Sequence, residues 1–247
     1  MPRIEKKRTD KGQRFDTAII VAIMGLIGTL VVGILNSPLL IKLLDRVPAS
    51  PTPARMNIPP DAGQLLFSED FEENAASGFA FETGKWEIIK DGSNYVLQGI
   101  ATESDTPAAK AYFGSNDFSN GIIEFRVKFL QPFGLYVDFH YQAETGGHVL
   151  HLSPTYQSLF LATNVFENGR WNYSVISSES SQSFTFQPNS WYKVQLESRG
   201  DEITLNLDGN RILSVSDSRF DKGRIRFALE PDTILELDDV MVWSLKP

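Results

Sequence analysis

The sequence predicts an all-β protein: a two-sheet antiparallel jelly-roll sandwich, preceded by one N-terminal transmembrane α-helix. Three observations predict this. From about residue 63 onward apolar side chains recur at every second position, the period of a strand with one buried face. Gly and Asn turn signals separate these short runs without a convincing amphipathic helix, which favours two packed antiparallel sheets. Residues 17–41 carry no charge and are long enough to span a bilayer.

The alternation is clearest in two segments, 121–129 and 134–141. The first sets apolar side chains against the charged set Glu124, Arg126 and Lys128. The second sets them against Tyr136, Asp138 and His140. The pattern returns in 192–196, 203–207 and 225–229, and Asp208-Gly209 is a turn pair that tolerates positive φ in a two-residue hairpin.

The N-terminal part divides into a basic cytoplasmic tail (1–16), a transmembrane helix (17–41) and a proline-rich linker (42–62). The helix would be roughly 37 Å long, enough for a hydrocarbon core of about 30 Å. It is longer than a signal-peptide apolar region, and no small-residue cleavage motif follows it. Six cations precede it, so we expect a cytoplasmic N-terminus, one pass through the plasma (inner) membrane and an extracytoplasmic domain at 63–247.

One side of the predicted membrane helix is small or polar. Its members fall within about 80° of arc at 100° per residue, and they are Ala18, Ala22, Gly25, Thr29, Gly33 and Asn36. Small faces let helix backbones approach closely, so this side is a candidate contact with other membrane proteins. The alternative is that Gly and Ala are simply common in membrane helices.

Composition excludes several classes of function. The 247-residue chain contains no cysteine, which excludes disulfides, thiolate metal sites and cysteine nucleophiles. Residues 63–247 carry 14 Lys and Arg against 26 Asp and Glu, a net charge of −12. Because such a domain repels phosphate backbones, nucleic acid is not expected as a partner.

Several stretches carry a resemblance to a known superfamily. They are "LLFSEDFEE" (65–73), "SNDFSNGIIEFRVKF" (115–129), "WYKVQLESRGDEITLNLDGNRILSVSDSRFDKGRIRFAL" (191–229) and "LELDDVMVWSL" (235–245). Over about 64–246 the chain resembles the concanavalin A-like lectin/glucanase superfamily, with laminin G-like jelly rolls and bacterial 3-keto-disaccharide hydrolase-type domains as its nearest relatives. The resemblance implies a jelly roll, but the superfamily includes lectins, hydrolases, lyases and inert spacers.

Catalysis is not expected from the motifs. A glucanase of this superfamily needs E-x-D-x-x-E, whose two glutamates act as nucleophile and general acid. The nearest segment, "YVDFHYQAE", has Asp138 but carries tyrosines at 136 and 141, where the glutamates would stand. We therefore expect no catalytic residues. If the chain is an enzyme, we expect it to be a glycoside hydrolase.

A sugar-binding face is the better hypothesis for the domain. If segments 121–129 and 134–141 pair, they offer aromatic and polar groups of the kind that glycan recognition needs. The candidates are Tyr136, Asp138, His140, Arg126, Glu124 and Trp171, with Trp171 and Tyr173 contributed by a loop. The alternative is a solvated sheet face with ordinary cross-strand ion pairs.

Metal sites receive weaker support. His148 and His151 would point to opposite faces of a strand, which does not suit zinc. The resemblance implies a possible structural calcium between the first and last strands, with Glu69, Asp70, Asp238 and Asp239 as candidate ligands, since calcium prefers carboxylate oxygens. The alternative is that acidic pairs are common in an acidic domain.

The sequence thus predicts a membrane-anchored extracytoplasmic sandwich that binds a glycan or cell-surface polymer without catalysis. Two alternatives remain open. One is an interaction subunit of a membrane protein complex, docking through its small-residue helix side. The other is a saccharide hydrolase. The expected partners are membrane lipid, a glycan and other membrane proteins.

Overall fold

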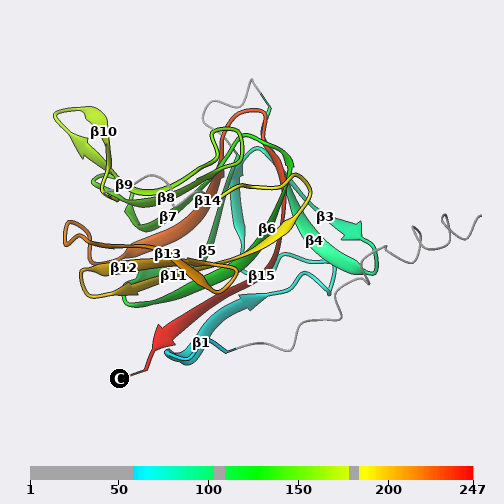
Figure 1. Cartoon of the computed structure of the whole chain (residues 1–247), viewed down its shortest axis with the longest axis horizontal. Coiled ribbons are helices and arrows are strands. Elements are labelled where there is room, and N and C mark those ends of the chain that lie inside the picture. Colours follow the sequence, from blue (N-terminus) through cyan, green and yellow to red (C-terminus); the bar gives the residue numbers. More distant parts are fainter. Residues whose placement is uncertain (1–57, 103–108, 178–183, 247) are drawn as a thin grey trace, which may run out of the picture. The chain divides into compact units, whose positions relative to one another are not determined.

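The computed structural model describes residues 58–102, 109–177 and 184–246, and every regular element in these ranges is a β-strand. The strands form two antiparallel sheets packed face to face (Figure 1). The predicted all-β sandwich is therefore confirmed. The predicted helix at 17–41, with its small-residue side, lies outside the described residues. Within the described ranges no helix has the length and hydropathy that a membrane crossing requires.

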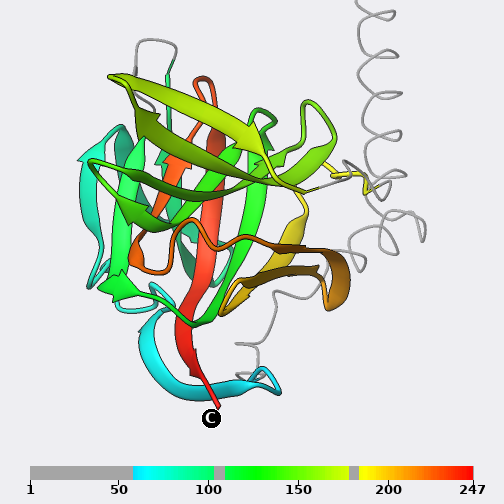
Figure 2. The ribbon, with the colours of Figure 1, turned by 90° about the vertical axis from the view of Figure 1, so that its left-hand side faces the viewer.

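Sheet A has eight strands in the order β13-β12-β11-β6-β15-β4-β3, with β1 also paired to β15. The strands are β13 (Asn210–Ser216), β12 (Glu202–Leu207), β11 (Trp191–Arg199), β6 (Gly121–Gln131), β15 (Ile234–Leu245), β4 (Asn94–Ile100), β3 (Lys85–Asp91) and β1 (Ala62–Glu69). Figure 2 shows β1 curving along the C-terminal strand β15, so the first and last strands of the sandwich are neighbours.

Sheet B has seven strands in the order β10-β9-β8-β7-β14-β5-β2. They are β10 (Arg170–Val175), β9 (Ser158–Glu167), β8 (Gly146–Ser153), β7 (Leu135–Gln142), β14 (Gly223–Leu229), β5 (Lys110–Phe118) and β2 (Ala80–Thr83). The hairpin of β9 and β10 curls away from sheet A at the edge of the sandwich (Figure 1).

The hairpins of sheet A follow the predicted turn chemistry. Asp208 and Gly209 link β12 to β13 with φ angles of 50° and 78°, the positive values that a tight two-residue turn requires. Gly200, with φ of 58°, turns β11 into β12. The register that these turns set places Leu196 opposite Leu205, both buried, so one alternating set faces the interior throughout.

The core lies between the two sheets. Phe125 of β6 meets Phe227 of β14 edge to face, with ring centroids 5.0 Å apart, and Phe227 stacks on Phe113 of β5 at 4.5 Å. All three rings are buried. Each contributes roughly 1.5–3 kcal/mol through burial alone, so this aromatic contact ties one sheet to the other. It also fixes which side of each strand remains on the surface.

Candidate functional site

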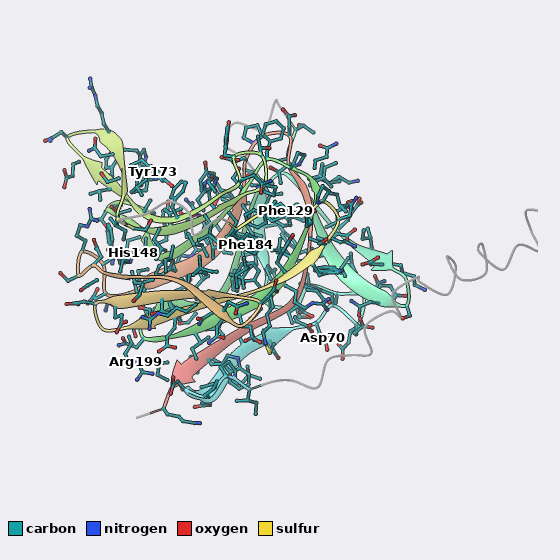
Figure 3. The ribbon with its side chains drawn as sticks, in the orientation of Figure 1. Asp70, Phe129, His148, Tyr173, Phe184 and Arg199 are labelled. Atoms are coloured by element: carbon teal, nitrogen blue, oxygen red, sulfur yellow. The ribbon has the colours of Figure 1, made fainter. Side chains whose placement is uncertain are left out.

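The surface of sheet B that points away from sheet A, called face B here, carries a row of aromatic side chains. Cross-strand partners share a face, which aligns Tyr136, His151 and Phe160 across β7, β8 and β9. Their ring centroids are 4.6 Å and 4.7 Å apart, and Tyr173 of β10 follows at 6.3 Å. These four residues form the aromatic row. Figure 3 shows Tyr173 at its outer end, where β10 curls away.

A glutamate directly after β14 joins the inner end of this row. The Tyr136 hydroxyl donates to Glu230 Oε1 at 2.7 Å, and His151 Nε2 lies 3.2 Å from the same oxygen. Burial raises the pKa of Glu230, but the hydrogen bonds from His151 and Tyr136 outweigh it, so the pKa lies below its usual value. Glu230 is therefore ionised at neutral pH. Burial and the Glu230 charge together raise the pKa of Tyr136, which stays a neutral donor.

Two atoms of this cluster have hydrogen-bonding capacity left over. Glu230 Oε2 and His151 Nδ1 are buried and find no partner in the described part of the chain. An ionised carboxylate oxygen accepts hydrogen bonds, and a ring nitrogen of histidine can accept or donate one. Only glycine fits at position 134, since a Cβ there would lie 2.3 Å from Glu230 Oε2 and 2.9 Å from His151 Nε2. Two unpartnered polar atoms thus lie beside a row of rings, an arrangement suited to a ligand with hydroxyl groups.

Beside the aromatic row, two arginines of β14 interleave with two tyrosines. Arg226 Nε donates to Asp138 Oδ2 at 2.6 Å, and its guanidinium also donates to the Tyr112 hydroxyl at 3.1 Å. The same guanidinium lies 3.8 Å from the centre of the Tyr141 ring. Arg224 lies 3.8 Å from the centre of the Tyr112 ring. Burial raises the pKa of Asp138 above its usual value, and the neighbouring Arg226 opposes that shift.

The charged candidates of segment 121–129 lie elsewhere, which corrects one expectation. Segments 121–129 and 134–141 do not pair, because β6 belongs to sheet A and β7 to sheet B. Glu124, Arg126 and Lys128 lie on the outer surface of sheet A, called face A here, with cross-strand ionic partners. These partners are Lys193 for Glu124 (2.8 Å), Asp238 for Arg126 (3.4 Å), and Asp91 (2.6 Å) and Glu236 (2.5 Å) for Lys128. Glu124, Arg126 and Lys128 therefore form ordinary cross-strand ion pairs, the alternative considered for this segment.

His140 also departs from the expected face. A bulge interrupts β7 after Phe139, and His140 adopts a φ of 52°. The bulge adds a residue out of register, so the His140 side chain turns to the interior instead of sharing face B with Tyr136 and Asp138. There its Nδ1 lies 3.1 Å from His148 Nδ1, and its Nε2 lies 2.7 Å from the Ser119 carbonyl oxygen. Figure 3 shows His148 between the two layers.

Trp171 and Tyr173 lie on strand β10, not in a loop as the sequence suggested. Trp171 pairs with Phe166 of β9, with ring centroids 5.1 Å apart, and both rings are partly exposed. Trp171 is two residues from Tyr173 on the same strand, so it shares face B and extends the aromatic surface outward.

The candidate calcium ligands converge only in part. Glu69 pairs with Val240 at the end of the β1–β15 ladder, which brings the two acidic pairs to one corner of sheet A. Their oxygens have protein partners, however: Glu69 accepts from the Phe71 amide, Asp70 from the Glu72 amide, and Asp238 from Asn94. Asp239 Oδ2 lies 3.5 Å from Arg126. Among the described residues, no group of three or more His, Cys, Asp or Glu side chains has the geometry of a metal site.

Sequence reasoning missed Arg224, Arg226, Glu230, His151 and Tyr112. A signal for the arginines was present, because Ile225, Phe227 and Leu229 were recognised as the buried set of their strand. The alternate residues 224, 226 and 228 must then point outward, and two of the three are arginines. No local pattern assigns a role to Glu230, which follows the end of its strand.

Comparison with known proteins supports the fold. No protein-family model matches the chain, and no curated protein matches it significantly. The family 66 carbohydrate-binding module from Bacillus subtilis matches with a TM-score of 0.55 and 19% identity, over 68% of this chain and 96% of that one. A family 16 mixed-linkage glucanase from Bacteroides ovatus, in complex with its product, matches with a TM-score of 0.52 and 14% identity, over 72% and 99%.

A third structure belongs to another glycoside hydrolase family. Domain 4 of the extracellular arabinanase AbnA from Geobacillus stearothermophilus, in complex with arabinotriose, matches with a TM-score of 0.51 and 10% identity, over 75% of this chain and 94% of that one. At such identities the likeness establishes the fold alone. The sandwich is consistent with the concanavalin A-like architecture that the sequence resemblance implied.

Proposed function

We propose that face B binds a saccharide, and that the chain is a membrane-anchored, extracytoplasmic glycan-binding protein without catalytic activity. One observation carries the proposal: the aromatic row lies next to the unpartnered polar atoms of Glu230 and His151. A sugar ring has apolar C–H faces that pack on aromatic rings and hydroxyl groups that hydrogen-bond to such polar atoms. Face B offers both kinds of contact on one surface.

The similar structures add support of a weaker kind. One is a carbohydrate-binding module, and two others hold a glucan product and arabinotriose. The membrane anchor is supported by the uncharged stretch 17–41 and the six cations before it. An anchored module of this kind would hold a saccharide near the outer surface of the membrane.

Glycan-array binding and calorimetry on the full-length protein test the proposal, in a detergent without a sugar headgroup. Tyr173→Ala removes a half-exposed ring from the aromatic row, and we expect affinity to fall about tenfold, corresponding to the loss of about 1.4 kcal/mol of stacking. Trp191→Ala removes a ring from face A and should leave affinity unchanged. If Tyr173→Ala still bound the saccharide and Trp191→Ala did not, the binding site would lie on face A and the proposal would be wrong.

A saccharide hydrolase is the second candidate, and one observation favours it. Asp138 and Glu230 share face B, and their pKa values are displaced in opposite directions, upward for Asp138 and downward for Glu230. Paired carboxyl groups of this kind divide acid and base roles in many hydrolases. Release of reducing sugar from the bound glycans, abolished by Glu230→Gln, would replace the non-catalytic proposal with this one.

A further inference from the structure

Arg224 differs from the other arginines of the sandwich. Five of them lie 2.5–3.4 Å from a carboxylate oxygen, and these are Arg126, Arg199, Arg211, Arg219 and Arg226. Arg170, in β10 next to the β9–β10 turn, is exposed. Arg224 is partly buried, and in the described ranges its guanidinium has no carboxylate partner. The Nε atom of Arg224 is fully buried and makes no hydrogen bond to any residue that the structure describes.

Among the described residues, the carboxylates nearest to this part of face B have other partners, so Arg224 is a cation without an ionic partner. Asp138 is engaged by Arg226 at 2.6 Å, and Glu82 lies 3.5 Å from Lys110. The ring of Tyr112 holds the guanidinium of Arg224 flat on one side. Stacking of this kind does not satisfy the N–H donors. The site therefore presents a planar donor group whose Nε has no acceptor among the described residues.

A carboxylate is the group that matches this donor best. A guanidinium binds a carboxylate through two parallel charge-assisted hydrogen bonds, which are roughly twice as strong as neutral ones. A charge that is partly removed from water loses part of its solvation, and a bound anion offsets that loss. The net charge of −12 on residues 63–247 opposes a long polyanion. It acts weakly on a single carboxylate, because salt largely screens charges that lie more than a Debye length of about 8 Å from it.

We propose that the saccharide taken by face B is acidic, a short oligosaccharide with a uronic acid residue whose carboxylate binds Arg224. The inference rests on the proposed function and names its ligand class. The uronate ring would lie beside the tyrosines of β5 and β7, and neighbouring neutral sugars would continue along the aromatic row. Arg224 would then determine specificity, while Tyr173 supplies affinity for any sugar.

Calorimetry on the full-length protein in sugar-free detergent tests the inference with matched probes. The acidic probes are short oligomers of galacturonate, mannuronate and glucuronate. Each is compared with its carboxyl-reduced counterpart, which keeps the ring and loses the charge. We expect at least one acid to bind tenfold or more tightly than its reduced form, with a preference that weakens as NaCl rises from 50 to 300 mM.

The variants separate charge from geometry. Arg224→Gln should abolish the preference for the acid and leave affinity for the reduced oligomer unchanged. Arg224→Lys should keep only part of the preference for the acid, because an ammonium cannot form the two parallel hydrogen bonds of a guanidinium. Arg211→Gln, an exposed arginine of face A, is the matched control and should change nothing.

The remaining outcomes overturn either this inference or the proposed function. Equal binding of acids and reduced forms, or binding of neutral glucan oligomers alone, overturns the inference and leaves saccharide binding intact. Selective binding of a sulfated disaccharide without any uronate oligomer overturns the carboxylate as the recognised group. Absence of binding to every acidic, neutral and sulfated probe overturns the proposed function, and the inference with it.

Discussion

Faces A and B arise from the same alternation of side chains along antiparallel strands, yet they differ in how their polar groups are satisfied. On face A, Lys193, Arg126 and Lys128 all lie within 3.4 Å of a carboxylate oxygen on a neighbouring strand. On face B, an arginine nitrogen, a glutamate oxygen and a histidine nitrogen are buried without a partner in the described residues, beside aromatic rings. The charged side chains of face A are mostly paired with one another, whereas face B has capacity left for a ligand.

This difference shows that charged residues alone do not indicate a binding surface. Face A carries several charged side chains, and it too has buried atoms without a partner, among them Glu124 Oε2. The ring of Trp191 on this face has Arg126 and Lys128 over it, 4.7 Å and 4.9 Å from the centre. Face B combines unpartnered atoms with a row of neighbouring aromatic rings whose outer member, Tyr173, is half-exposed. That combination distinguishes the two surfaces.

The largest effect expected from this comparison is the loss of Arg226. Arg226→Gln leaves Asp138, whose side chain is 6% exposed, buried without its cation. Removing one member of a buried ion pair typically lowers the free energy of unfolding by about 3–5 kcal/mol, and we expect a loss in this range. Chemical denaturation of the full-length protein in detergent, followed by near-UV circular dichroism of the sandwich, measures it.

Lys128→Gln is the matched variant on face A. Its partner Glu236 is 6% exposed, as Asp138 is, so this variant also leaves a buried carboxylate without its cation and a loss of about 3–5 kcal/mol is expected. A much smaller loss for Lys128→Gln would contradict the view that the two faces contain ion pairs of equal burial.

The layer between the two faces should respond to pH through His148. Burial, as the largest cause, lowers the pKa of His148 to about 4, whereas an unfolded histidine titrates near 6.5. Between these values the folded state binds fewer protons, so its stability rises with pH through this window and is complete above about 6.5. The full effect is at most about 3 kcal/mol. Denaturation midpoints from pH 4 to 7.5 measure it, and His148→Gln should flatten the slope.

A slope of the opposite sign would have a specific meaning. Three hydrogen bonds link the Ser119 carbonyl through His140 and His148 to Asp217. Satisfying all of these hydrogen bonds needs three N–H protons on two rings, one more than two neutral imidazoles carry. Stability that falls as pH rises would show that the pair keeps this extra proton.

Much of the fold followed from the sequence because burial on one face of a strand imposes a period of two, which is visible locally. The turn at Asp208-Gly209 was equally local, since few residue pairs accept its φ angles. Pairing between strands was not. Segments 121–129 and 134–141 are adjacent in the sequence, but the first pairs with β11 and β15 and the second with β8 and β14.

The candidate site was only half visible for the same reason. Tyr136, Asp138 and Trp171 do lie on face B, because simple alternation holds in those parts of β7 and β10. Alternation predicted that His140 lies on face B, but its side chain points to the interior. The cause is a bulge that shifts the register by one residue, and no residue type in the sequence predicts the bulge. The partners Arg226 and Glu230 come from about 90 residues further along the chain. Only tertiary structure brings them together.

The smallest expected effect is the most informative about recognition. Arg211 pairs with Glu202 at 3.0 Å, and both side chains are more than half exposed. An exposed pair contributes about 0–1 kcal/mol, so Arg211→Gln should shift the unfolding midpoint very little. It nevertheless removes the same charge from the domain as Arg224→Gln. If both variants weakened binding of a uronate oligomer equally, the attraction would come from the overall electrostatic field of the domain. That result would contradict a specific contact between the carboxylate and Arg224.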